Sequence, residues 1–538
     1  MPPSRPLDAF WLPASMRPLV EDLPWEVRHV VAGQSVAPGD GVAVRWPVLG
    51  RDELATLLRE LRAACDQAEP DLVERWQRAL QAVPGVLMEQ PEMLEAIACY
   101  TGYPGSMMML AFAQGDLMQF GDLGRALGYD PRWAAARAWQ PMPGGLPGKV
   151  RFYPARRLAR CFAWTQGRAP LFRRLPPAQL AIGFAAGNVP GNGLLIALQL
   201  HVANHAALGA RAASPPAVLV RNSRQAPLLA PWVLSAVEQI DPKLVAGLAM
   251  LVFDYDDVAL QRTLLGEADL VMAAASDQTI AAIDSHLEGA GSPARFHRHG
   301  HKVSFSVVGR EALGGDLGLP ASLAALDSTF WDQLGCLSAR VHFVEEGGTH
   351  SPAGYAAALS DAMRRFARQL PRGVAPARAL HRAFDTYKLL ENGTTVRVLT
   401  TYEDEALVVL DKRSWNTNQW RDTVNRCTGR VVVVRPVEDL AEVFTCYLRG
   451  LPSENLQSLS VAVSSERVLE LAEGAGRCGI TALRSLGRAA FPKMAYSWDG
   501  LLPMDLGNAR PPGYFTTLET DDPLTSMAEA AAQLDLSE

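Results

Sequence analysis

Cys336 is the residue of this sequence with the clearest capacity for covalent chemistry. It stands in the segment Asp332-Gln333-Leu334-Gly335-Cys336-Leu337-Ser338, directly before an apolar run typical of a strand. A thiolate at a strand entrance is well suited to attack a thioester, because the product is another thioester. An isolated cysteine is also often a small buried hydrophobic residue, and the segment alone leaves both interpretations open.

A glycine-rich segment provides a second candidate, Asn188. The segment Gly187-Asn188-Val189-Pro190-Gly191-Asn192-Gly193 follows a predicted strand and opens a predicted helix. Glycines let the backbone approach a ligand closely, and a helix N-terminus favours negative charge. The segment lacks the dinucleotide fingerprint Gly-x-Gly-x-x-Gly, so a simple turn is an equal alternative. The amide of Asn188 is suited to donate a hydrogen bond to a developing oxyanion.

Charged residues follow two further predicted strands. Arg221 and Arg224 flank Asn222-Ser223, where paired guanidinium groups can bind phosphate, although a solvated loop fits the same residues. Glu345-Glu346 follows the strand after Cys336. We expect a solvated turn there, with a general base as the alternative.

Three alternating histidines, His297, His299 and His301, suggest a metal site. Alternate residues on a strand are too closely spaced for easy binding by all three, and no nearby carboxylate or cysteine has ligand spacing. We therefore expect a polar turn and no metal.

The order of apolar runs predicts an α/β fold. Apolar strands and helical patterns alternate from residue 178 onward, with the first strands expected at 180–184, 217–221, 248–253 and 268–273. Strands this apolar form parallel sheets covered by helices on both faces. Ligands bind at the carboxyl ends of such strands, so we expect the loops after 184, 221 and 273 to line a site.

Later segments indicate a second, smaller α/β unit. Its strands are expected at 303–308, 340–344, 396–400, 407–410 and 431–434, and its helices at 352–370 and 440–448. A Pro/Gly-rich stretch at 141–148 indicates a linker. We expect an N-terminal, partly helical region at 1–145, a cofactor-binding domain at 146–310, a catalytic domain with Cys336 at 311–505 and a C-terminal tail at 506–538.

Composition disfavours several classes of function. The 538 residues include 51 basic and 57 acidic ones, and the net charge of −6 gives no reason to expect nucleic acid or an anionic membrane as a partner. No apolar run reaches the length of about 18 residues that suggests a membrane span, and the N-terminus lacks the apolar core of a secretory signal. Seven scattered cysteines without a Cys-x-x-Cys pair disfavour disulfides and structural zinc, which is typical of a cytoplasmic protein.

Several segments, in order, resemble the LuxC-like acyl-CoA reductases, a branch of the aldehyde dehydrogenase superfamily. They are GNVPG at 187–191, DLVMAAASDQTI at 269–280, GHKVSF at 300–305, DQLGCLS at 332–338, and LQS at 456–458 with WDG at 498–500. The resemblance covers about residues 145–505. It implies an aldehyde dehydrogenase-like fold, with a Rossmann-type parallel-sheet cofactor domain, a smaller α/β catalytic domain and an additional N-terminal region.

This resemblance implies reduction of an acyl thioester, carried by CoA or an acyl carrier protein, to an aldehyde. Cys336 would form an acyl-enzyme, and Asn188 would stabilise the oxyanion together with the backbone N–H of Cys336. Hydride from a nicotinamide would then release the aldehyde. Such reductases often work beside an acyl-activating or acyl-transferring enzyme, and superfamily members commonly form homo-oligomers, so we expect both kinds of partner.

The resemblance also places Arg221, Ser223, Arg224 and Ser276 at the cofactor. Arg221 stands where relatives have a lysine at the adenosine ribose, and Ser276 stands beside the expected pyrophosphate. Arg224 replaces a glutamate frequent in NAD-preferring members. An arginine there would neutralise a 2′-phosphate, so NADPH is the expected donor, with NADH as the alternative.

Two departures from ordinary aldehyde dehydrogenases are informative. The stretch 298–302 lacks the glutamate that activates water in those enzymes, which favours thioester reduction over oxidation to an acid. Ala274 and Ala275 replace a usual glycine before Ser276. The alternatives to reduction are a CoA-acylating aldehyde dehydrogenase acting oxidatively and a noncatalytic acyl-binding partner.

Overall fold

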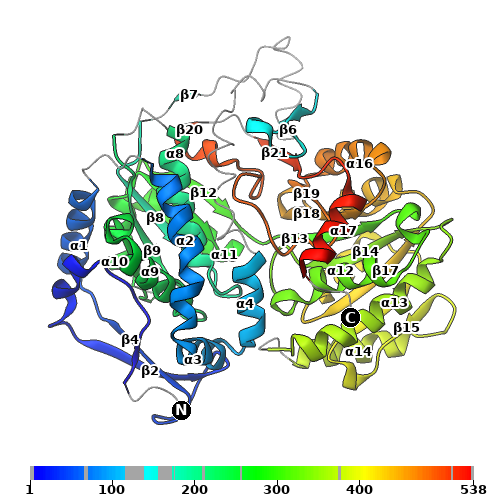
Figure 1. Ribbon diagram of the computed structural model, residues 1–538, viewed down its shortest axis with the longest axis horizontal. Helices are drawn as coiled ribbons and strands as arrows, with labels where there is room; N and C mark the ends of the chain where they lie inside the picture. Colours follow the sequence, from blue (N-terminus) through cyan, green and yellow to red (C-terminus); the bar gives the residue numbers. More distant parts are fainter. Residues whose placement is uncertain are drawn as a thin grey trace. The chain divides into compact units, whose positions relative to one another are not determined.

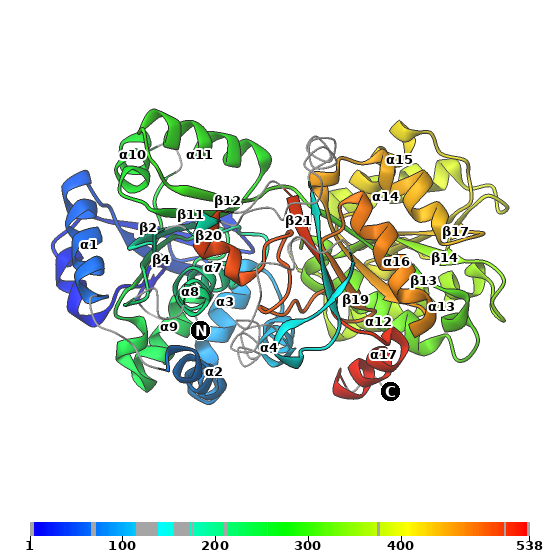
Figure 2. The same ribbon diagram turned by 90° about the horizontal axis from the view of Figure 1, so that it is seen from above.

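The computed structural model describes residues 5–65, 71–114, 138–154, 173–174, 176–208, 213–254, 257–373, 377–509 and 513–534. These residues form two compact units, which Figures 1 and 2 show in two views. The first contains the described parts of 1–127, 172–301 and 503–509, and the second those of 128–171, 302–502 and 510–538. None of the described helices is long and apolar enough to cross a membrane.

A parallel sheet with the strand order β10-β9-β8-β11-β12 forms the centre of the first unit. Its strands are β8 (Leu180–Phe184), β9 (Ala217–Arg221), β10 (Leu248–Leu251), β11 (Leu270–Ala274) and β12 (Arg295–His299). The connecting helices include α7 (Asn192–Leu198), α9 (Leu229–Ile240), α10 (Val258–Gly266) and α11 (Asp277–Gly289). The strand order reverses between β8 and β11, which makes this a doubly wound sheet with a switch point there.

The alternating histidines do not form the expected polar turn. His297 and His299 belong to β12, which pairs in parallel with β11 at the sheet edge. Edge strands keep one side partly exposed, which explains the polar composition of β12. Among the residues that the structure describes, no group of three or more His, Cys, Asp or Glu side chains could hold a metal ion.

The N-terminal residues are part of the first unit. They form β1 (Leu7–Asp8), β2 (Trp25–Val31), β3 (Gln34–Ser35), β4 (Val42–Pro47), α1 (Arg51–Ala64), α2 (Leu72–Met88), α3 (Pro91–Thr101) and α4 (Gly105–Gln114). Helix α2 packs against α9 (Figures 1 and 2), and Arg75 forms an ion pair of 2.7 Å with Asp241. Trp11 exchanges backbone hydrogen bonds of 2.8 and 2.9 Å with Met250. These contacts explain why the units do not divide at residue 145 as expected.

A mixed sheet of ten strands organises the second unit, in the order β15-β16-β17-β14-β13-β18-β19-β21-β6-β5. The strands from β16 to β21 run parallel to one another. Their bounds, with those of the three antiparallel edge strands, are β5 (Gln140–Pro141), β6 (Lys149–Pro154), β13 (Val303–Val308), β14 (Ala339–Glu345), β15 (Val396–Val398), β16 (Leu407–Asp411), β17 (Val431–Val437), β18 (Leu456–Ala462), β19 (Ala482–Ser485) and β21 (Gly513–Leu518).

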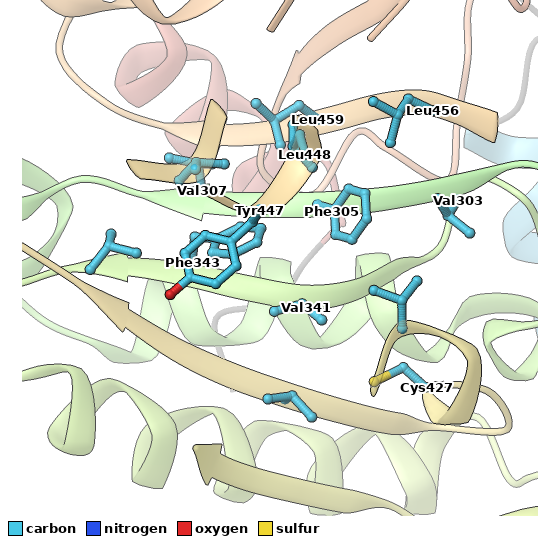
Figure 3. Packing of buried hydrophobic residues seen from close by; sticks show 14 of the residues in the cluster. Val303, Phe305, Val307, Val341, Phe343, Cys427, Tyr447, Leu448, Leu456 and Leu459 are labelled. Atoms are coloured by element: carbon cyan, nitrogen blue, oxygen red, sulfur yellow. The ribbon is translucent and has the colours of Figure 1, made fainter. Parts of the chain in front are cut away.

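Helices cover this sheet and close its core. They are α12 (Gly318–Thr329), α13 (Pro352–Gln369), α14 (Ala377–Leu390), α15 (Thr417–Arg426), α16 (Ser465–Cys478) and α17 (Pro523–Leu534). Figure 3 shows part of the core, where Phe305 and Phe343 lie among aliphatic side chains and Cys427 is fully buried. The helix expected at 440–448 is present in irregular form, as the π-helix η11 (Val443–Tyr447) followed by the 3₁₀-helix η12 (Leu448–Gly450).

The Pro/Gly-rich stretch at 141–148 reverses the chain inside the sheet and is not a linker. It joins the antiparallel pair β5 and β6, and Met142 N donates to Gly148 O at 3.1 Å. Gly148 has φ of 86°, and a Cβ there would lie 1.8 Å from Leu518 O. The composition therefore marks a close backbone approach. The expected C-terminal tail likewise contributes β21 and α17 to the second unit.

Candidate active site

Cys336 lies just after a turn with an unusual backbone. Trp331, Asp332 and Gln333 have φ values of 52°, 51° and 59°. Residues other than glycine pay about 1 kcal/mol or more for such left-handed conformations. Three in succession persist only where the surroundings hold them. The left-handed turn at 331–333 therefore costs free energy, and contacts around it must hold the chain on its path into β14.

Gln333 and Asp332 hold this turn. The Gln333 amide donates to Ala339 O at 2.9 Å and to Val431 O at 2.8 Å, and it accepts from Val431 N at 2.8 Å. Asp332 forms an ion pair of 2.9 Å with Arg430, and neither side chain is exposed. The residues that the sequence placed in the nucleophile motif thus anchor the Cys336 turn to β14 and β17.

The sulfur of Cys336 interacts with Gln457 of β18 and with Asp499, which lies in the turn at 498–501. Burial and the charge of Asp499 raise the pKa of the Cys336 thiol, and a hydrogen bond from Gln457 and the Lys302 ammonium oppose this rise, which leaves the pKa at about 11. The residue as a whole keeps partial exposure. Its carbonyl oxygen accepts a hydrogen bond of 2.7 Å from Ser304 Oγ in β13. The arrangement holds a protonated thiol in a defined place.

Gln457 and Asp499 were not assigned a role from the sequence. Gln457 lies in β18 and its amide nitrogen donates to Asp499 Oδ1 at 2.6 Å. The family-like segments LQS and WDG contain these two residues, so the signal was present. The sequence could not show that Gln457 and Asp499 lie beside Cys336 in the folded chain.

In the first unit, Asn188 lies in the loop between β8 and α7. Tyr103 donates a hydrogen bond of 3.0 Å to the carbonyl of Asn188. A Cβ at Gly187 would lie 2.2 Å from Ser223 Oγ, so the loop packs tightly against the loop that follows β9. The glycine-rich segment therefore brings Asn188 and Ser223 to the same end of the sheet.

Asn188 and Ser276 lie on the two sides of the switch point. Their loops follow β8 and β11, the neighbouring strands where the order reverses. Open α/β sheets bind ligands at this position. Ser276 also caps α11, because its Oγ accepts from Thr279 N at 3.2 Å. The position and the close glycine packing fit a dinucleotide at the carboxyl ends of these strands.

Arg221 and Arg224 both have partners inside the first unit. Arg221 is buried and donates to Phe253 O at 3.0 and 3.3 Å, which ties β9 to the end of β10. Arg224 is ion-paired with Asp254, and its guanidinium lies 5.5 Å from the Trp46 ring. The hydrogen bond from Arg224 lowers the pKa of Asp254. A carboxylate at this arginine is a feature that the sequence did not reveal.

The sequence of this chain matches one known family. The family model described as acyl-CoA reductase (LuxC) matches residues 168–506, more than half of the chain. The chain belongs to the acyl-CoA reductase (LuxC) family. It is accordingly an oxidoreductase acting on acyl or aldehyde groups, as expected from the resemblance.

Solved structures show that this chain has the aldehyde dehydrogenase fold. Lactaldehyde dehydrogenase from Escherichia coli matches with 16% identity and a TM-score of 0.52, over 91% of this chain and 98% of that one. A benzaldehyde dehydrogenase from Corynebacterium glutamicum matches with 12% identity and a TM-score of 0.53, over 91% and 98%. An indole-3-acetaldehyde dehydrogenase of P. syringae matches with 13% identity and a TM-score of 0.56, over 94% and 99%. No sequence match was found among curated proteins.

Glu345 is not in the expected solvated turn. It is the last residue of β14, fully buried, and pairs with Arg310 at 2.7 Å and Arg467 at 2.8 Å. Burial opposes its charge, but hydrogen bonds from Arg467 and Arg310 lower its pKa to about 2. A carboxylate bound in this way is a poor proton acceptor, so Glu345 joins elements of the second unit and does not serve as a base.

Proposed function

We propose that this chain reduces an acyl thioester to an aldehyde through an acyl-enzyme on Cys336. The observation that supports this most strongly is the strained, doubly anchored turn before Cys336. A cysteine that only fills space needs no such support. Cys427, for example, lies in the hydrophobic core of the same unit with no exposure (Figure 3).

In this proposal the Cys336 sulfur bonds to the acyl carbon, the bond from that carbon to the carrier sulfur breaks, and the carrier leaves as a thiol with the proton that Cys336 gives up. Asn188 and the backbone N–H of Cys336 donate hydrogen bonds to the oxyanion, where each donor can contribute about 3 kcal/mol in the transition state. When bound, a nicotinamide cofactor supplies the hydride that turns the acyl group into an aldehyde. Cys336 is then released for another cycle.

The stretch 298–302 supports reduction over hydrolysis. Its side chains include no carboxylate, and Arg298 pairs with Asp284 while Lys302 donates to Glu454 O. This stretch therefore supplies no base that would activate water for hydrolysis of the acyl-enzyme. Oxidative CoA-acylation of an aldehyde is the same reaction reversed and is the alternative. A noncatalytic acyl-binding partner would not require the anchored thiol.

NADPH is the proposed hydride donor, with NADH as the alternative. Arg224 would exchange the Asp254 carboxylate for the 2′-phosphate, since guanidinium groups bind both anions in the same geometry. Arg221, Ser223 and Ser276 are proposed to lie along the same dinucleotide. The Asp254 carboxylate is the observation that favours the alternative, because an acidic residue near this position suits ribose hydroxyls.

The proposed reaction requires a thioester carrier as the substrate partner. The thioester carrier is proposed to be CoA or an acyl carrier protein, delivered by an acyl-activating or acyl-transferring enzyme. A homo-oligomer and a cytoplasmic location are proposed as well.

The test is cofactor consumption with a panel of acyl-CoA thioesters. Wild type should oxidise NADPH only when an acyl-CoA is present and should form aldehyde. Cys336→Ala should abolish this activity, whereas Cys99→Ala, which changes an exposed cysteine of α3, should not. Sustained turnover by Cys336→Ala would refute the proposal.

A further inference from the structure

Gln457 connects the Cys336 sulfur to a carboxylate. Its amide nitrogen donates to Asp499 Oδ1 at 2.6 Å, and its side chain also hydrogen-bonds with the sulfur. The amide oxygen of Gln457 has no partner among the described residues, so both bonds come from the NH₂ group, which has two donors. Two acceptors of one NH₂ group lie about 5 Å apart. One water molecule spans such a distance in proton transfer.

Both members of this pair are fixed in place. Gln457 is 2% exposed, and its carbonyl oxygen accepts from Thr481 N at 2.8 Å and Thr481 Oγ1 at 3.0 Å. Asp499 has φ of 50° in a two-residue turn closed by hydrogen bonds of 2.8 and 2.9 Å between Trp498 and Leu501. Asp499 keeps partial exposure, so its carboxylate can exchange protons with solvent.

The charged groups near Cys336 differ in whether they can accept the proton of its thiol. Lys302 and Arg340 are cations that interact with the sulfur. The Lys302 ammonium donates to Glu454 O, and the Arg340 guanidinium donates to Val424 O at 3.2 Å. Cations of this kind stabilise a thiolate but do not take up its proton. Asp499 is a carboxylate that interacts with the sulfur, and it raises the pKa of the Cys336 thiol.

We propose that Asp499 is the proton carrier of the Cys336 thiol, with Gln457 as the residue that positions the two groups. This inference rests on the proposed function, because it assigns a role within the same acyl transfer. Asp499 accepts the S–H proton as the sulfur bonds to the acyl carbon. The carbon–sulfur bond to the carrier then breaks, and Asp499 returns the proton to the leaving thiolate, which departs as a thiol. The carboxylate is regenerated and charge is balanced.

Asp499→Asn should move two measurements in opposite directions. Loss of the negative charge makes the thiolate easier to form, so iodoacetamide should alkylate Cys336 several-fold faster near neutral pH. Loss of the proton acceptor should slow acyl-enzyme formation by about 100-fold or more. Asparagine tolerates left-handed backbone well, so the turn at 498–501 should be preserved. A role limited to electrostatics or to folding would not separate the two rates in this way.

The experiment mixes full-length protein with an acyl-CoA without cofactor and follows the acyl-enzyme by intact mass. Glu470→Gln, an exposed carboxylate of α16, is the matched control and should acylate at the wild-type rate. Gln457→Leu should slow both acylation and alkylation, since it removes the donor to the sulfur.

Acylation of Asp499→Asn at the wild-type rate or faster would overturn the proton carrier. Slower alkylation of Asp499→Asn would also overturn the proton-carrier role. It would show that the substitution displaced the groups around the Cys336 sulfur. The proposed function would survive either result as long as wild type acylates and Cys336→Ala does not. Failure of the wild type to form an acyl-enzyme would instead refute the proposed function, and the inference with it.

Discussion

The Asp332 carboxylate and the Arg430 guanidinium lie 2.9 Å apart, and neither side chain is exposed. Asp332 also accepts a hydrogen bond of 2.9 Å from Gly373 N, and Arg430 donates to Leu370 O at 2.7 Å. A buried ion pair adds little net stability, but it fixes the geometry of the groups that share it. Here it fixes a left-handed residue four positions before the nucleophile.

Arg430→Gln should destabilise the protein by about 3–5 kcal/mol, because it leaves the Asp332 charge buried without its cation. Urea unfolding would measure the loss. The double variant Asp332→Asn/Arg430→Gln should recover part of it, since no uncompensated charge remains. Equal or greater destabilisation of the double variant would show that the pair does not act as a unit.

Gln333→Leu should lower kcat/KM by at least about tenfold while the variant remains folded. The change removes the amide that bonds to Ala339 O, Val431 O and Val431 N, so the turn before Cys336 loses its support. A displacement of about 1 Å at a reacting atom can reduce rates about 100-fold. Steady-state kinetics and circular dichroism would separate misplacement from unfolding. Wild-type kinetics would contradict the assigned role.

Alkylation of Cys336 should have an alkaline pH profile. Burial disfavours the charged thiolate and raises the pKa of Cys336 to about 11, so reactivity appears only as pH rises towards that value. The rate should increase about tenfold between pH 8 and pH 9, because the thiolate fraction grows tenfold for each pH unit below the pKa. Peptide-resolved iodoacetamide labelling would measure this. A plateau below pH 8 would contradict it.

Two variants at the cofactor position should have opposite effects. Arg224→Glu should raise the KM for NADPH far more than the KM for NADH. Asp254→Asn should lower the KM for NADPH, because Arg224 then loses the nearer of its two carboxylate partners among the described residues and keeps Glu26 at 3.8 Å. Steady-state kinetics with NADPH and with NADH would measure both KM values for each variant. Equal effects of Arg224→Glu on the two KM values would remove the argument for NADPH.

Strands buried on both faces could be predicted from the sequence, whereas contacts between distant residues could not. The strands at 180–184 and 303–308 have the expected ends, and every residue in them is buried. Glu345 was misjudged because its partner Arg467 is 122 positions away in the sequence. The partner of Arg224, Asp254, was missed for the same reason.

The candidate site was predicted in part. The segments around Asn188, Ser276 and Cys336 carry family-like residues at strand ends, where local pattern is informative. Gln457 and Asp499 stood in segments that were noticed, but their 2.6 Å contact joins residues 42 positions apart. A hydrogen bond between side chains that are distant in the sequence leaves no periodic pattern in it. The pairing of Gln457 with Asp499 can therefore be seen only in the folded structure.

The most direct test of the central claim is to map the acyl group after wild-type protein is mixed with an acyl-CoA in the absence of cofactor. Peptide mass analysis should find one acyl thioester, on Cys336, and addition of NADPH should remove it and release aldehyde. Aldehyde formation without an acyl group on Cys336, or with the acyl group on another cysteine, would contradict the account.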